Sequence, residues 1–367
     1  METPMTARAI FTVLALCAAG ACTTVPPAPV LRAMPTVLPS AAEGVPADGR
    51  ASFRARFCAL ARDSAATAGD DACADWLWRL DDEPPPAAAP PDRPLDGALR
   101  VFIVGGAFSD CYGARSVAWR GATERLSAAG LRVSSLPING RSSADHNARL
   151  IAEAFAEAPP SADDRVIMVG YSKGAIDALH FLANHPEQAR VVDALVSVAG
   201  PIHGSRVADR GAWLYDTFLQ RSFAGRCDPG DGGVVDSLRV ETRQAWLAEH
   251  GLPDGVRYYS LAAFTTREHI ARALMPSWRI LAREDVRNDG QVAVSEALLP
   301  GSTLLAFVNA DHWDLAIDIE DELKMLAKRR DGREFPHGLL FEAIVRHVAS
   351  DLAPGPAAAA AASGLEP

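Results

Sequence analysis

The chain has 367 residues, 49% of them hydrophobic, and carries a formal net charge of −10 at pH 7. This composition excludes a generally disordered chain and is sufficient for a large buried core. Binding to nucleic acid needs lysine and arginine gathered on one surface. The sequence contains no such block, so we expect no nucleic-acid partner.

The first 21 residues have the features of an export signal. Arg8 precedes an apolar run from Ala9 to about Ala21, which is too short to span a bilayer as a permanent helix. The stretch Ala19-Gly20-Ala21-Cys22 resembles the lipobox of bacterial lipoproteins, in which this cysteine is lipidated. We therefore predict export to the periplasm as an outer-membrane lipoprotein anchored through Cys22, with secretion after the same cleavage as the alternative.

Composition divides the rest of the chain into four regions. Residues 22–50 are rich in proline and alanine and are predicted to form a flexible tether. Residues 51–98 are predicted to hold a helical segment followed by a proline-rich linker. Residues 353–367 show no core-forming pattern and are predicted to be a disordered tail. We therefore expect the main folded domain over residues 99–352.

Apart from Cys22, the region after the signal contains Cys58, Cys73, Cys111 and Cys227. An oxidising compartment permits disulfides, and four cysteines allow three different pairings. We favour Cys58–Cys73 and Cys111–Cys227, because the first two cysteines lie in one short segment. The sequence contains neither a CxxC pair nor a close cluster of histidine and cysteine, so we expect no zinc site.

Within residues 99–352, short apolar runs alternate with amphipathic helical segments. Most of the runs show little polar alternation, as expected for parallel strands that are buried on both faces. They lie at residues 99–106, 164–170, 192–200, 256–264 and 303–309, and the helical segments lie at 115–129, 143–158, 173–184 and 335–349. This order predicts an α/β fold with a mainly parallel sheet flanked by helices.

The second apolar run ends in Gly170-Tyr171-Ser172-Lys173-Gly174, which joins it to the next predicted helix. A GxSxG pattern alone is weak, but between a buried strand and a helix it predicts a nucleophile elbow with Ser172 at its tip. The start of the helix would then direct the Lys173 N–H at a developing oxyanion. The alternative is an ordinary strand-to-helix turn. A lysine at a helix start is usually solvated, so we assign the Lys173 side chain no role.

With these residues the sequence resembles the α/β-hydrolase superfamily, in particular its bacterial lipases and esterases, over roughly residues 99–352. The resemblance implies the chain order nucleophile, acid, histidine. Asn288-Asp289-Gly290-Gln291-Val292 is similar to the NDGxV phrase that carries the acid in bacterial lipases, so Asp289 is the expected acid. His312 follows the apolar run 304–308, at the loop position where the family keeps its histidine. The alternative candidates are Asp285 and Asp314 for the acid and His203, His269 and His337 for the histidine.

The resemblance also implies a second oxyanion donor after the first strand of the core. Gly105-Gly106-Ala107 stands where the family often has His-Gly-x, and we expect the Ala107 N–H to be this donor. The residues expected to contact the substrate are Gly106, Phe108 and Tyr171. Pro201-Ile202-His203-Gly204-Ser205 resembles a segment that lines the site in many lipases and leads into a cap. From about residue 205 to about residue 255 we therefore expect an inserted helical cap, or a mobile lid.

These predictions converge on serine-dependent hydrolysis of carboxylic esters, of the lipase or esterase type. Ser172 would attack the ester carbonyl, His312 would take the serine proton, and Asp289 would hold the imidazole in the right tautomer. The expected partner is a small-molecule or lipid ester, and we expect no cofactor and no metal. The alternatives are an acyltransferase or thioesterase with the same triad, and a catalytically inactive hydrolase-like module that binds a partner.

Overall fold

The computed structural model describes residues 47–64, 72–85, 95, 97–112, 118–214, 227–317 and 334–353. The predicted signal, Cys22, most of the predicted tether and nearly all of the predicted tail lie outside these residues. Among the described helices, none is long and apolar enough to cross a membrane.

The strands of the described residues form one sheet in the order β1-β8-β7-β6-β5-β3-β4, and β2 pairs with β8 beside this path. Neighbouring strands are parallel except for β2, which is antiparallel to β8. The strands are β1 Ala47–Asp48, β2 Leu77–Trp78, β3 Leu99–Val104, β4 Arg132–Ser135, β5 Arg165–Tyr171, β6 Ala194–Val198, β7 Arg257–Ala263 and β8 Thr303–Val308. The α/β fold and the five predicted strands are confirmed as β3, β5, β6, β7 and β8.

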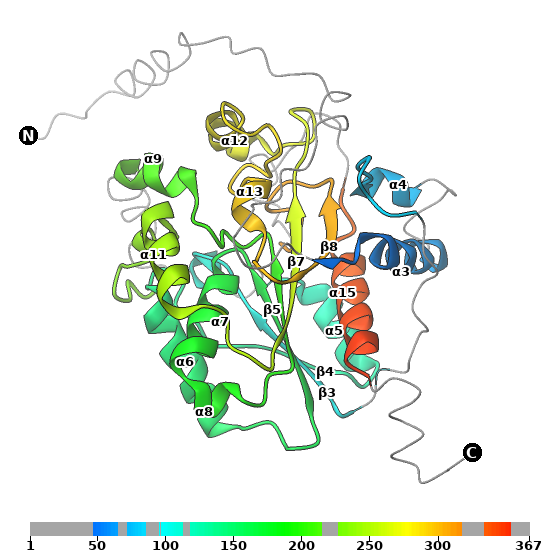
Figure 1. Cartoon of the computed structure of the whole chain (residues 1–367), viewed down its shortest axis with the longest axis vertical. Helices are drawn as coiled ribbons and strands as arrows, with labels where there is room; N and C mark the ends of the chain where they lie inside the picture. The colour runs from blue at the N-terminus through cyan, green and yellow to red at the C-terminus, as the bar shows by residue number, and fades with distance from the viewer. Residues whose placement is uncertain are drawn as a thin grey trace, which may run out of the picture.

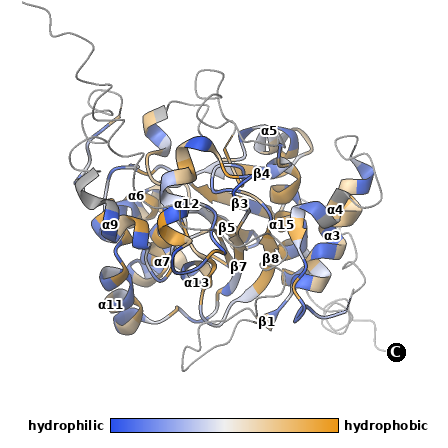
Figure 2. Ribbon diagram, turned by 90° about the horizontal axis from the view of Figure 1, so that it is seen from above, coloured by the Kyte–Doolittle hydropathy of each residue, from blue (hydrophilic) through white to orange (hydrophobic). Residues whose placement is uncertain are grey.

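Helices cover both faces of the sheet, as Figures 1 and 2 show. One face carries α6 Ala144–Glu157, α7 Lys173–Asn184, α8 Pro186–Ala189 and α11 Val240–His250, and the other carries α3 Arg50–Asp63, α5 Arg120–Ala128 and α15 His337–Leu352. Strand side chains alternate between the two layers: Val101 and Ile103 pack under α5 and α15, whereas Phe102 and Val104 pack under α6 and α7.

Shorter helices lie mainly in the connections. They are α4 Ala72–Trp76, η1 Ser109–Tyr112, α9 Arg206–Leu214, η4 Asp236–Leu238, η5 Arg272–Leu274, α12 Met275–Leu281 and α13 Val294–Ala297. The edge strand β4 was not predicted, because its side chains are mostly exposed and polar and give no buried-strand pattern. Within the predicted cap, the described residues form α9, η4 and α11, and the remainder lies outside the described residues.

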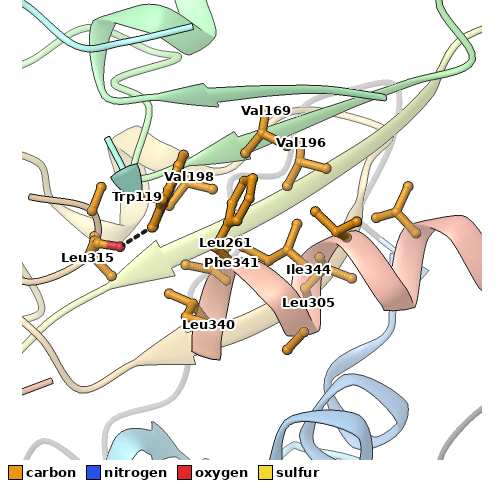
Figure 3. Close-up of a cluster of buried hydrophobic side chains, with 14 of the residues drawn as sticks. Trp119, Val169, Val196, Val198, Leu261, Leu305, Leu315, Leu340, Phe341 and Ile344 are labelled. Carbon is orange, nitrogen blue, oxygen red and sulfur yellow. Dashed lines mark hydrogen bonds between the residues drawn. The ribbon is translucent and has the colours of Figure 1, made fainter. Parts of the chain in front are cut away.

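The core on the α15 side also holds the loop that follows β8. Trp119 is fully buried and stacks on Phe341 of α15 with ring centroids 4.9 Å apart. Its Nε1 donates a hydrogen bond to the Leu315 carbonyl at 2.7 Å (Figure 3), and its backbone N–H donates to the Ala316 carbonyl at 2.7 Å. These bonds connect the start of α5 to residues just after His312.

The segment before residue 99 belongs to the sheet domain, which corrects the predicted boundaries. β1 pairs with the start of β8 and β2 pairs with its end. Phe53 and Phe57 of α3 are fully buried in the same core as α15. The predicted tether therefore ends before Ala47, and the folded domain does not start at Leu99. Strands of two residues carry no periodic signal, and the partner strand β8 is distant in the sequence.

The structure joins the cysteines in the favoured pairing. Cys58 and Cys73 connect α3 to α4 with Cα atoms 5.2 Å apart, and Cys111 and Cys227 have Cα atoms 4.6 Å apart. The second disulfide ties η1, just after β3, to the segment that leads into η4 and α11.

Candidate active site

Ser172 occupies a sharp turn between β5 and α7. Its φ of 55° and ψ of −129° lie in a region of backbone conformation that residues other than glycine rarely adopt. The turn has no room for side chains at its two glycines: a Cβ on Gly174 would lie 2.2 Å from the Val104 carbonyl oxygen, and one on Gly170 would lie 2.5 Å from the Ala175 Cα. The Ser172 N–H donates to the Val198 carbonyl at 2.9 Å, which anchors the turn to β6. These features are those of a nucleophile elbow.

His312 lies on the loop after β8 and faces the serine. Its Nε2 is 2.9 Å from the Ser172 Oγ, and its Nδ1 is 2.7 Å from the Asp289 Oδ2. A carboxylate can only accept here, so Nδ1 carries the proton and Nε2 is free to accept the serine proton. The backbone N–H of His312 also donates to the Asp289 carbonyl at 2.9 Å. The structure thus brings the three predicted residues into one hydrogen-bonded chain.

Asp289 is fully buried and held in place by its own loop. Its Oδ1 accepts hydrogen bonds from the Gln291 and Val292 N–H groups, each at 2.8 Å, so that Oδ2 is left for His312. Gly290 has a φ of 96°, a conformation that favours glycine and lets the loop turn back. The alternative acid Asp285 instead pairs with Arg287, and His312 Nδ1 does not contact it.

Asp311 and Tyr171 support the histidine loop, and neither role was predicted. The two Asp311 carboxylate oxygens accept from the Trp313, Asp314 and Ala271 N–H groups at 2.9 to 3.0 Å. Tyr171 was expected to contact substrate, but its side chain is 3% exposed and packs in the core, where its hydroxyl donates to the His312 carbonyl at 2.6 Å. Burial, reinforced by nearby carboxylates, raises the pKa of Tyr171 well above its usual value, so the phenol keeps this proton.

Two backbone N–H groups are available near the serine. The Lys173 N–H lies at the start of α7 and the Ala107 N–H lies after β3, and neither donates to another group of the described chain. Gly106 brings the β3 loop close, because a Cβ there would lie 3.0 Å from the Ser172 Cβ. The Phe108 N–H is already used by the Gly140 carbonyl at 2.9 Å. The partly exposed Phe108 has a φ of 63°, which completes the tight turn at this point.

The Lys173 side chain corrects the expectation of a solvated lysine. It is 1% exposed, and its Nζ pairs with the Asp177 Oδ1 at 2.5 Å, one helical turn along α7. The sequence contained a signal for this pair, since lysine and aspartate four residues apart lie on the same helix face. It contained no local signal that this face of α7 is buried.

The segment 201–205 lies against the acid loop. The His203 Nε2 is 2.9 Å from the Leu298 carbonyl, so this alternative histidine is engaged away from the serine. The Ser205 hydroxyl donates to the Gln291 carbonyl at 2.9 Å, and Arg206 pairs with the buried Glu296 at 3.1 Å. Gly204 packs directly on α11, because a Cβ there would lie 2.3 Å from the Val240 Cα.

The described residues contain one group with the spacing of metal ligands, namely Asp110, Cys111 and Cys227. The two cysteines are joined in a disulfide, so their sulfur atoms do not form a thiolate site. The expectation that no metal is required stays a prediction.

Comparison with solved structures places the chain in a family. The crystal structure of the metagenomic carboxyl esterase MGS0156 is 33% identical, with a TM-score of 0.75 over 93% of this chain and 99% of that chain. The chain belongs to the esterase and lipase branch of the α/β-hydrolases. The Bacillus licheniformis lipase BlEst2 is 20% identical over 70% of this chain in both its propeptide and its mature form; the propeptide form shares the fold with a TM-score of 0.50, and the mature form has a TM-score of 0.49. These matches cover 52% and 94% of the respective BlEst2 chains. No protein-family model and no curated protein matches the chain.

Proposed function

We propose that this α/β-hydrolase cleaves carboxylic esters through an acyl-enzyme on Ser172. The observation that carries the proposal is the chain Asp289–His312–Ser172, with distances of 2.7 Å and 2.9 Å between its interacting atoms. The likeness to a carboxyl esterase over nearly the whole chain supports the same reaction class.

The reaction has two stages, formation of the acyl-enzyme and its hydrolysis. The Ser172 Oγ attacks the ester carbonyl carbon while its proton passes to the His312 Nε2, and the carbonyl oxygen becomes an oxyanion that accepts from the Lys173 and Ala107 N–H groups. The carbon–oxygen bond to the alcohol then breaks, and His312 returns the proton to the leaving alcohol. In the second stage, His312 takes a proton from water, which attacks the acyl-enzyme and releases the acid.

The test is hydrolysis of p-nitrophenyl esters from acetyl to palmitoyl by the wild type and by Ser172→Ala. We expect turnover by the wild type and a loss of at least about 10³-fold in the variant, because the nucleophile is gone. Ser302→Ala is the matched control, since it also removes a serine hydroxyl but lies just before β8, at the end of the strand opposite to His312. Equal turnover by the wild type and Ser172→Ala would contradict the proposal.

Two further measurements separate the alternatives. An acyltransferase or thioesterase would give new esters with added alcohols, or would prefer thioesters, with the same Ser172 dependence. A binding module would neither turn over esters nor react with a fluorophosphonate probe, because only an activated serine is labelled.

The chain-length profile of ester hydrolysis then distinguishes an esterase from a lipase. A mobile lid would appear as activation by lipid interfaces.

We also propose that the protein is exported and anchored to the outer membrane through a lipid on Cys22. The support is the signal-like start of the sequence and the lipobox-like stretch at residues 19–22. The two disulfides suit an oxidising compartment.

A further inference from the structure

A chain of buried polar side chains that the triad does not use lies behind the elbow. The Lys173 Nζ pairs with the Asp177 Oδ1, and the Asp177 Oδ2 accepts from the Asn147 Nδ2 at 2.8 Å. The three side chains are 1%, 0% and 0% exposed, respectively. Groups buried this deeply lose their hydration and must be satisfied inside the protein, so their arrangement is well determined.

The same chain continues to the loop before α6. The Asn147 Oδ1 accepts from the Asn139 N–H at 2.8 Å, and the Asn147 Nδ2 also donates to the Asn139 carbonyl at 3.0 Å. The Asn147 amide therefore holds both backbone groups of Asn139. This arrangement connects α6 and α7 to the loop at residues 139–140.

Gly140 carries the connection to the β3 loop. Its carbonyl accepts from the Phe108 N–H at 2.9 Å, and its N–H donates to the Asp110 Oδ1 at 3.0 Å. A Cβ on Gly140 would lie 2.5 Å from the Phe108 nitrogen, so the two loops are in direct contact. Hydrogen bonds, together with the peptide bond between Asn139 and Gly140, thus connect the side chain of Lys173 to the residue that follows Ala107.

We propose that the side chains of Lys173, Asp177 and Asn147 position the two oxyanion donors relative to each other. We call these three residues, together with the backbone of Asn139 and Gly140, the oxyanion-positioning network. The inference rests on the proposed function, because the donors it concerns are the Lys173 and Ala107 N–H groups. These donors follow different strands, β5 and β3, and both stabilise the oxyanion fully only when each lies about 3 Å from it.

The charge on Asp177 makes the network depend on the Lys173 side chain. Burial raises the pKa of Asp177 above its usual value, whereas the Lys173 ammonium and the Asn147 amide act in the opposite direction. An ionised Asp177 accepts from both neighbours at once. Without the ammonium, the buried carboxylate would take up a proton or rearrange, and its bond to Asn147 would change. Lys173 and Asn147 are therefore positioning residues of the site through their side chains.

The experiment compares the wild type with Asn147→Ala and Lys173→Met on the p-nitrophenyl ester that the wild type hydrolyses fastest. An alkyl trifluoromethyl ketone is the second probe, because attack by the Ser172 Oγ converts its carbonyl into an oxyanion while the serine proton passes to His312. We expect kcat to fall about 10- to 100-fold with KM changed less than about threefold, and the ketone Ki to rise by the same factor as kcat falls. The pH at which kcat/KM is half-maximal should not move, since the triad is untouched.

Ser302→Ala is the matched control for the loss of a buried hydrogen bond. The Ser302 hydroxyl is 2.8 Å from that of Ser260, beside the start of β8 and away from the triad. This variant should lower Tm but keep kcat within about twofold. Lys173→Met/Asp177→Asn removes the unpaired buried charge, so it should regain Tm relative to Lys173→Met without regaining kcat.

The outcomes separate the inference from the proposed function. A wild type that hydrolyses no ester, or hydrolysis that survives in Ser172→Ala, overturns both. With Ser172-dependent hydrolysis established, unchanged kcat in folded Asn147→Ala overturns the network alone. So does a fall in kcat without the matching rise in the ketone Ki, or a double variant that regains kcat together with Tm.

Discussion

At the scale of single residues, the site is built from backbone conformations that few side chains tolerate. Ser172, Phe108 and Ala199 have φ values of 55°, 63° and 48°, and they follow β5, β3 and β6, respectively. Such conformations cost a non-glycine residue roughly 1–3 kcal/mol each and persist only where the surroundings enforce them. These residues lie at the ends of adjacent strands. The strained conformations that shape this edge of the sheet therefore lower the stability of the fold, and the surrounding contacts must compensate for that loss.

Asp289→Asn should reduce kcat by about 10³- to 10⁴-fold while the protein stays folded. An amide at residue 289 can donate to the His312 Nδ1, which favours the tautomer whose Nε2 carries the proton and does not accept from Ser172. Steady-state kinetics on the best p-nitrophenyl ester measure the effect. Asp285→Asn is the matched control, because it changes the alternative acid and should leave kcat within about twofold. A larger loss in Asp285→Asn than in Asp289→Asn would reject the assigned acid.

At the scale of elements, α3 and α15 pack around a histidine whose burial makes its protonation unfavourable. His347 of α15 is 6% exposed and meets Phe53 of α3 edge to face, with ring centroids 5.5 Å apart. Burial, together with the Arg56 charge, lowers the pKa of His347 to about 4, although Asp351 acts in the opposite direction. Charging this ring in the folded protein is therefore unfavourable.

This histidine should make the protein less stable in acid. The unfolded chain binds the proton near pH 6.5 and the folded protein only near pH 4, so the free energy of unfolding falls as the pH drops between these values. The loss attributable to His347 is about 2–3 kcal/mol at pH 4.5. Urea denaturation of the wild type and His347→Leu at pH 7.5 and 4.5 measures it. Between pH 7.5 and 4.5, the free energy of unfolding of His347→Leu should fall by about 2–3 kcal/mol less than that of the wild type. The control His250→Gln, at an exposed site, should behave as the wild type does. Equal acid sensitivity in the wild type and His347→Leu would refute the assignment.

At the scale of the whole molecule, the parallel sheet brings distant residues to one edge. The carboxyl ends of β3, β5 and β8 carry Ala107, Ser172 and His312, and the loop after α12 adds Asp289. Parallel strands place all their carboxyl ends on the same side, which is where open α/β sheets bind ligands. The Cys111–Cys227 disulfide fastens the segment leading to α11 beside this edge.

The proposed lipid anchor also concerns the whole molecule. Cys22→Ser should lose incorporated palmitate and leave the membrane fraction when the full chain is expressed in a bacterium, because the acyl chains supply the membrane affinity. Metabolic labelling followed by fractionation measures both effects. Cys17→Ser, a substitution within the apolar run of the signal, is the control and should keep the label. Wild-type protein without the label would support secretion instead.

Local patterns in the sequence determined much of this protein. Five strands, four long helices and the glycine-flanked Ser172 were predicted, because short stretches of sequence are enough to show apolar periodicity and turn residues. The candidate acid and histidine followed from family phrases, and the structure brings both to the serine. The disulfide pairing was chosen from a short spacing, and the structure shows the same pairing.

Tertiary structure decided what neighbouring residues do not encode. The Lys173 side chain is buried because α6 packs on α7, where Asn147 of α6 donates to Asp177, the ion-pair partner of Lys173. Tyr171 turns to the core because the end of β5 lies against the His312 loop. The Phe108 N–H is taken by Gly140, which leaves the Ala107 N–H as the available donor. β1 and β2 form only because β8 supplies their hydrogen-bond partners. In each case the deciding contact joins residues that packing, rather than sequence proximity, brings together.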